Sequence, residues 1–199
     1  MAKKSLLILP LLLGVFFYVK FISFKNKTNC YSSETLEMVK NGDLVLRCGR
    51  SVESFTVYTA DKNSQFSHIG IISIENNTRY VIHAVPCEDN IIKKEKLTYF
   101  ISPKFASTYA IYRTNYNASQ LKKVVNQALL FYTKKYTFDT NYDLTTKTKL
   151  YCTELILEAF KRTGIQLNIK LSEFNYIIGK HLIILPSEFT KSPLFNKII

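Results

Sequence analysis

The fold of this chain is decided by one stretch, Leu150-Tyr151-Cys152-Thr153-Glu154-Leu155-Ile156. The apolar residues of this stretch and its continuation recur at helical spacing: Leu155, Ile156, Ala159 and Phe160. Gly164 follows shortly after the basic pair Lys161-Arg162, a pattern typical of the end of a helix. The sequence therefore predicts an amphipathic helix whose first turn carries Cys152 on its buried face.

Cys152 is a candidate nucleophile because of this position. A thiol in the first turn of a helix lies near unpaired backbone N–H groups and the positive end of the helix dipole, and both favour the thiolate. The alternative interpretation is a small core residue, which is the common fate of a free cysteine. What favours catalysis is a pair of histidines far upstream, His68 and His83.

Length and composition bound the class of protein. With 199 residues, of which 47% are hydrophobic, the chain can form one folded domain with a real core. Its net charge of +12 is spread along the chain without a run typical of a nucleic-acid arm, so no nucleic-acid partner is expected. Two interpretations of the basic charge remain open, a solvated basic face and a face that lies against anionic lipid or an acidic polymer.

The chain has four cysteines: Cys30, Cys48, Cys87 and Cys152. No two of them have the spacing of a zinc site or of a redox pair, and the sequence leaves open whether they form disulfides.

The N-terminal residues 1–24 form a basic start followed by an apolar run that Lys20 interrupts. The run is shorter than the roughly 20 residues of a spanning helix, but Lys20 can extend its amine to the membrane surface. A signal peptide begins in the same way, yet no small-residue cleavage site follows. We expect a single-pass membrane anchor or signal segment over 1–24 that contacts membrane lipid, a linker over 25–33, and a domain over 34–199 that is exported. Lysines flank both ends, so the orientation stays open.

The order of the expected elements indicates an α+β fold, an antiparallel sheet with helices packed to one side. The expected strands and helices alternate along the chain: strands over 43–48, 67–74, 79–85 and 109–113, helices over 34–40, 119–132 and from 152, and extended structure over 177–185. The two strands that carry the histidines are joined by the turn signal Asn76-Asn77. With a two-residue loop, Glu75 faces Thr78, and His68 and His83 become diagonal neighbours on one face. A three-residue loop would place them on opposite faces.

The resulting set of residues suits nucleophilic catalysis without a metal or other cofactor. Cys152 would supply the nucleophile, His68 the general base, and His83 a hydrogen bond that orients the base. The helix N-terminus, including the N–H of Cys152, would stabilise an oxyanion, and Tyr151 and Gly70 are the adjacent candidates for oxyanion or substrate binding. Zinc is the alternative, but only three candidate ligands exist and their spacing matches no known site.

These motifs resemble the circularly permuted papain-like amidases, the YiiX/YaeF-like branch of the NlpC-like cell-wall peptidase superfamily. Four segments carry the resemblance, which extends from about Ser33 to Leu194: Asn41-Gly42-Asp43-Leu44-Val45, Ser67-His68-Ile69-Gly70-Ile71, Tyr151-Cys152-Thr153-Glu154-Leu155-Ile156 and Leu185-Pro186-Ser187-Glu188-Phe189. The histidine precedes the cysteine, the reverse of the order in papain. The resemblance implies the permuted papain-like fold, with His68 and Cys152 as the catalytic pair.

One departure from the family leaves the substrate class open. Many of these amidases have a glutamate where this chain has His83, and a histidine there is similar to the lecithin:retinol acyltransferase-like relatives. Three functions follow: a cysteine amidase working through a Cys152 thioester on peptide or cell-wall amides, a lipid acyltransferase or acyl hydrolase at a membrane surface, or a non-catalytic binding module. Glu154 is expected to support the first turn of its own helix. Glu88 is a weaker alternative as the group that orients the base.

Overall fold

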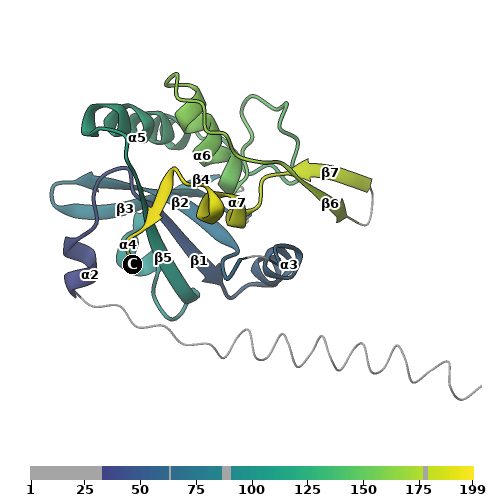
Figure 1. The fold of residues 1–199 in the computed structure, drawn as a ribbon, viewed down its shortest axis with the longest axis horizontal. Helices are drawn as coiled ribbons and strands as arrows, with labels where there is room; N and C mark the ends of the chain where they lie inside the picture. The colour runs from purple at the N-terminus through teal and green to yellow at the C-terminus, as the bar shows by residue number, and fades with distance from the viewer. Residues whose placement is uncertain (1–32, 63, 87–90, 177–178) are drawn as a thin grey trace, which may run out of the picture.

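The fold is built on a six-stranded antiparallel sheet, seen in the computed structural model of the chain (Figure 1), which describes residues 33–62, 64–86, 91–176 and 179–199. The strands occur in the spatial order β4-β3-β2-β1-β5-β8. Their bounds are β1 (Leu44–Gly49), β2 (His68–Glu75), β3 (Thr78–Ala84), β4 (Ile92–Lys96), β5 (Ala106–Thr114) and β8 (Phe195–Lys197). A separate hairpin of β6 (Ser172–Tyr176) and β7 (Gly179–Ile183) projects from the body of the molecule (Figure 1).

Two long helices cover one face of the sheet. The helices are α2 (Ser33–Glu37), α3 (Val52–Ala60), α4 (Leu97–Phe100), α5 (Ala118–Thr133), α6 (Cys152–Lys161) and α7 (Pro186–Lys191), and α5 and α6 lie together on one side (Figure 1). The helix expected over 119–132 begins one residue earlier, and its cap is Asn117, which forms a capping box with Gln120. Phe131 is buried on its inner side, whereas Tyr132 is 37% exposed.

The opposite face of the sheet is also buried, so the expectation of helices on one side holds only for the long helices. Alternate strand residues form a second core with the short helix α4 and the end of the chain: Val45, Ile72, Val81 and Ile111 pack with Leu97, Phe100, Ile198 and Ile199. Strands that are buried on both faces read as nearly continuous apolar runs. That is why the sequence did not reveal the second layer.

The hairpin of β2 and β3 has the predicted register. Glu75 pairs with Thr78 and Ile71 pairs with Ile82, so the loop contains only Asn76 and Asn77. Both asparagines have positive φ, 46° and 60°, the conformation of the type I′ turn that joins strands most tightly. The prediction that His68 and His83 share a face is confirmed.

Strand β4 consists mostly of charged residues. It runs to Lys96, lies at the edge of the sheet beside β3, and pairs Lys93 with His83. Its charged residues are typical of an edge strand, because charge there prevents pairing with other chains. This strand carries Glu95 into the neighbourhood of the histidines.

A buried carboxylate anchors the start of β1. Asp43 is 1% exposed and accepts hydrogen bonds from Nε and Nη2 of Arg113 at 2.8 and 2.7 Å and from the backbone N–H of Lys40 at 2.7 Å.

Replacing Arg113 with alanine is expected to lower the free energy of unfolding by about 3 kcal/mol, because Asp43 would stay buried without its cation. Urea unfolding measures this. Lys123→Ala on the exposed side of α5 is the control, with a change within about 0.5 kcal/mol, and an equal loss in both variants would contradict the assignment.

Several expectations fall on residues that the structure does not describe. The anchor predicted over 1–24, most of the linker, Cys30, Cys87 and Glu88 lie outside the described residues. Within the described part of the chain, no helix is both long and apolar enough to span a membrane. Cys48 and Cys152, the two cysteines in the described part of the chain, form no disulfide with each other.

Candidate active site

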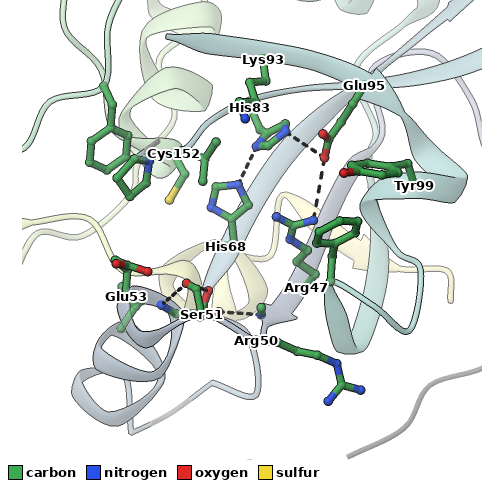
Figure 2. A pocket seen from close by; sticks show the side chains of 18 of the residues that line it. Arg47, Arg50, Ser51, Glu53, His68, His83, Lys93, Glu95, Tyr99 and Cys152 are labelled. Atoms are coloured by element: carbon green, nitrogen blue, oxygen red, sulfur yellow. Dashed lines mark hydrogen bonds and ion pairs between the residues drawn. The ribbon is translucent and has the colours of Figure 1, made fainter. Parts of the chain in front are cut away.

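The residues predicted to act together line one cavity. Its volume is about 460 Å³, and Cys152, His68 and His83 all contribute to its wall (Figure 2). They come from the start of α6, the start of β2 and the end of β3. His68 and His83 precede Cys152 by 84 and 69 residues in the sequence. The sheet and the helix packed on it bring all three residues to one cavity.

Cys152 is the first residue of α6, as the apolar spacing predicts. The helix begins there because Tyr151 is extended, with φ −90° and ψ 174°, and its backbone N–H donates to Oε2 of Glu154 at 3.2 Å. Glu154 therefore has the predicted role in supporting the first turn. Burial raises the pKa of Glu154 to about 8, which further disfavours it as a charged catalytic group at neutral pH.

Two opposing effects decide the charge state of Cys152. Burial raises the pKa of the thiol to about 11, although backbone N–H groups of Ile69, Thr153 and Cys152 itself stabilise the thiolate. The predicted effect of the helix N-terminus is present but smaller than the effect of burial. With a pKa of about 11, Cys152 is a neutral thiol at neutral pH and would need a base to act as a nucleophile.

The two histidine rings are joined by a short hydrogen bond. Nε2 of His68 lies 2.8 Å from Nδ1 of His83. Both side chains are buried, and burial lowers the pKa of each; the charge of Arg47 lowers them further. Both imidazoles are therefore neutral at neutral pH, and one donates to the other.

Glu95 and Arg47 extend this chain and were missed by the sequence analysis. Oε1 of Glu95 lies 3.2 Å from Nε2 of His83 and 3.9 Å from Nη1 of Arg47, as Figure 2 shows. Burial opposes ionisation of Glu95, but the contact with His83 and the charges of Arg47 and Lys93 outweigh it and lower its pKa. Glu95 is thus an anion held behind the histidines. The available signal was a single glutamate among the lysines of 93–96.

This arrangement assigns the protons of both imidazoles. Nε2 of His83 lies 3.2 Å from Oε1 of Glu95 and forms no hydrogen bond with another described residue, so the carboxylate favours a proton on this nitrogen. Nδ1 of His83 then accepts from Nε2 of His68. Nδ1 of His68 is left with its lone pair, and His68 and Cys152 both line the cavity drawn in Figure 2. A histidine in this state is a base.

Two other predicted site residues are placed differently. Tyr151 is buried, and its hydroxyl accepts a hydrogen bond from the backbone N–H of Ile184 at 3.0 Å. At Gly70, a Cβ would meet a Val81 methyl at 2.4 Å and the Ile82 carbonyl oxygen at 3.0 Å, so only glycine fits. Neither is among the described residues that line the cavity. The backbone N–H groups at the start of α6 remain the candidates for an oxyanion site.

A metal site receives no support from side-chain clustering. Across the described ranges, no group of three or more His, Cys, Asp or Glu residues is placed to hold a metal ion. The two nitrogens of His83 face His68 and Glu95. A metal ion bound by His83 would have to replace the contact of this ring with His68 or with Glu95.

Comparisons with known proteins agree with the fold. The chain is similar to the crystal structure of the metalloprotein yiiX from Escherichia coli O157:H7, with a TM-score of 0.68 and 17% identity, covering 80% of this chain and 96% of that chain. No curated protein sequence matches it. A family model described as permuted papain-like amidase enzyme, YaeF/YiiX, C92 family matches residues 38–199. Since this match spans most of the chain, the protein belongs to the permuted papain-like amidase family.

Proposed function

We propose that this protein is a cysteine amidase in which Cys152 is the nucleophile and His68 the general base. One observation carries the proposal: a thiol at a helix start lines the same cavity as an imidazole that is held by His83 and Glu95. Membership of an amidase family supplies the reaction class. The residues supply the roles.

The proposed reaction has two halves. In the first, the sulfur attacks the amide carbonyl carbon while its proton moves to Nδ1 of His68. The oxyanion that forms accepts hydrogen bonds from backbone N–H groups at the start of α6. The C–N bond then breaks, the amine leaves with the proton from His68, and a thioester remains on Cys152. In the second half, water attacks the thioester, His68 takes and returns a proton, and the carboxylic acid is released.

The buried relay has a defined task in these steps. In the free protein both Cys152 and His68 are neutral, because burial disfavours the charged form of each. When His68 becomes an imidazolium, its Nε2–H bond to His83 and the Glu95 carboxylate behind it stabilise the positive charge. The charge pair therefore forms as the sulfur attacks and does not pre-exist.

A second function shares the same acyl-enzyme. If an alcohol or amine replaced water in the second half, the protein would be an acyltransferase, and the apolar segment 1–24 with the basic composition favours one that works on lipid at a membrane surface. Membrane anchoring through 1–24 and export of the domain are part of this proposal. A purely binding role is disfavoured, because it requires neither the thiol nor a polarised histidine.

The experiment that tests the proposal is mapping of the acyl-enzyme. The protein is mixed with an activated amide, a short acyl p-nitroanilide, quenched in acid and digested for mass spectrometry. We expect one acyl adduct, on the peptide containing Cys152, that hydroxylamine removes. An adduct on Cys48, or turnover of the substrate with no thioester in a rapid-quench series, would overturn the proposal. Adding glycerol or a lysolipid alcohol distinguishes transfer from hydrolysis by its product.

Glu95 is expected to act as a positioning residue. Replacing Glu95 with alanine should lower kcat/KM by about 30-fold, the equivalent of about 2 kcal/mol, since His83 loses the acceptor that sets its tautomer. Glu95→Gln keeps an acceptor oxygen without the charge, so most activity should return. In this variant the imidazolium of His68 is less stabilised, so the pKa of His68 falls and the acidic limb of the pH profile moves to lower pH. Equal losses in both variants with an unshifted pH profile would indicate a merely structural role.

A further inference from the structure

The wall of the cavity holds a cation with few hydrogen-bond partners, the Arg47 guanidinium, which lies over the Phe100 ring with 4.0 Å from Cζ to the ring centroid. Arg47 lies on β1 opposite His68, lines the cavity, and its side chain is only 12% exposed. Its Nη1 donates to the Phe100 carbonyl at 2.8 Å. The Glu95 carboxylate is 3.9 Å away, beyond hydrogen-bond distance, and Nε is buried without a partner in the described part of the chain.

Such a guanidinium has unused binding capacity. It carries five N–H donors in a planar fork, and a buried charge is normally paired and hydrogen-bonded. Glu95 contacts His83 more closely than it contacts Arg47, so it does not neutralise Arg47 fully. Burial lowers the pKa of Arg47 to about 10, which leaves it charged at neutral pH. An additional anion in the cavity would complete its coordination.

Other residues of the cavity favour the same ligand charge. Lys93 and Lys104 line it, and neither forms an ion pair with a carboxylate of the described residues. Arg50 also contributes to the wall (Figure 2), and the lining has two acidic side chains, Glu53 and Glu95. The apolar part of the wall comes from seven further side chains: Val57, Val85, Pro86, Tyr99, Phe105, Phe138 and Tyr142.

We propose that the substrate is an amide or ester whose acyl part carries an anionic group, a carboxylate or a phosphate, bound by Arg47. This inference rests on the proposed function and names its substrate class. Arg47 and Cys152 line the same cavity, so an anionic group bound by Arg47 would share that cavity with the carbonyl under attack. A carboxylate or phosphate matches the planar fork of a guanidinium better than any neutral group. Lys93 and Lys104 raise the local concentration of such a substrate.

The test compares matched coumarin esters that differ only at the far end of a short acyl chain. The glutaryl ester carries a carboxylate, a phosphonobutanoyl ester carries a phosphate-like group, and a carbamoylbutanoyl ester is neutral. We expect kcat/KM for one or both anionic esters to exceed that of the neutral ester by about tenfold, the ratio given by about 1.4 kcal/mol. Which anionic ester is preferred distinguishes carboxylate from phosphate substrates.

Variants assign this preference to the cavity. In Arg47→Gln, the ratio of kcat/KM for the anionic ester to kcat/KM for the neutral ester should be close to one. A general loss of activity, caused for example by a shift of Glu95, lowers both values equally and leaves their ratio unchanged. Lys122→Gln on the exposed side of α5 removes the same charge and should leave the ratio unchanged. If Arg47→Gln fails to fold, the double variant Lys93→Gln, Lys104→Gln should lower the ratio at least about threefold.

The outcomes separate the two proposals. A ratio of one or below in the unmodified protein, with every ester still hydrolysed through Cys152, overturns the anionic substrate and leaves the cysteine hydrolase standing. If Lys122→Gln lowers the ratio as much as Arg47→Gln does, the proposal of an anion bound by Arg47 is also overturned. The preference would then come from the basic surface as a whole. Absence of any acyl adduct on Cys152 overturns the hydrolase itself.

Discussion

Replacing Cys152 with serine will lower kcat/KM for any hydrolysed amide by at least about 10⁴-fold. A serine hydroxyl is far less acidic than a thiol, and the same burial that raises the pKa of Cys152 to about 11 disfavours an alkoxide still more. His68, whose pKa is lowered by burial, is too weak a base to activate it. The measurement is steady-state turnover of the p-nitroanilide with acyl-adduct mapping on the variant.

Cys48 provides the matched control. It is the other described cysteine, lies on β1 and is 1% exposed, so it is present in the same domain without lining the cavity. Cys48→Ala should retain kcat/KM within about threefold, although a small cavity in the core will lower stability by about 1 kcal/mol. Loss of activity in Cys48→Ala at a temperature where it is folded, or activity above about one per cent in Cys152→Ser, would contradict the assignment of the nucleophile.

The histidine pair could be predicted from the sequence because its geometry is local. Strand side chains alternate with a period of two, and the turn at Asn76-Asn77 fixes which residues face each other. Once the register is known, His68 and His83 must share a face, as their 2.8 Å contact shows. The start of α6 was equally local, because apolar spacing and the cap interaction of Glu154 lie within one turn of Cys152.

The rest of the site depends on contacts between distant segments. Glu95 reaches His83 only because β4 pairs with β3, and a short edge strand of charged residues has no apolar alternation to announce it. Arg47 faces His68 through the pairing of β1 with β2, which no turn signal specifies. The pKa of Cys152 rises because the domain closes around the thiol. Burial of this kind is a property of tertiary packing, so the position of Cys152 in the helix could not reveal the effect that dominates its pKa.

Replacing His68 with alanine will lower kcat/KM by about 10³-fold at neutral pH. The loss follows from the charge states of the resting site, where a thiol with a pKa of about 11 cannot supply enough thiolate without a base. His83 is not expected to substitute, because in the proposed mechanism it acts on the thiol only through His68, to whose Nε2 its Nδ1 is hydrogen-bonded. His68→Asn is the control for packing, since it keeps a polar side chain but accepts no proton.

The pH dependence decides whether His68 acts as a base or only fills space. Because burial lowers its pKa well below 6.5, the neutral imidazole persists into mildly acidic solution. The unmodified protein should therefore show a flat kcat/KM from neutral pH down to an acidic limb below 6.5. Without the base, the rate must follow the thiolate fraction and rise about tenfold per pH unit towards the thiol pKa near 11. The rate of Cys152→Ser at each pH is subtracted from the profiles of the unmodified protein and of His68→Ala, which removes hydrolysis that does not involve the thiol. A variant that is slower by one constant factor, with the flat profile unchanged, would mean that proton transfer does not pass through His68.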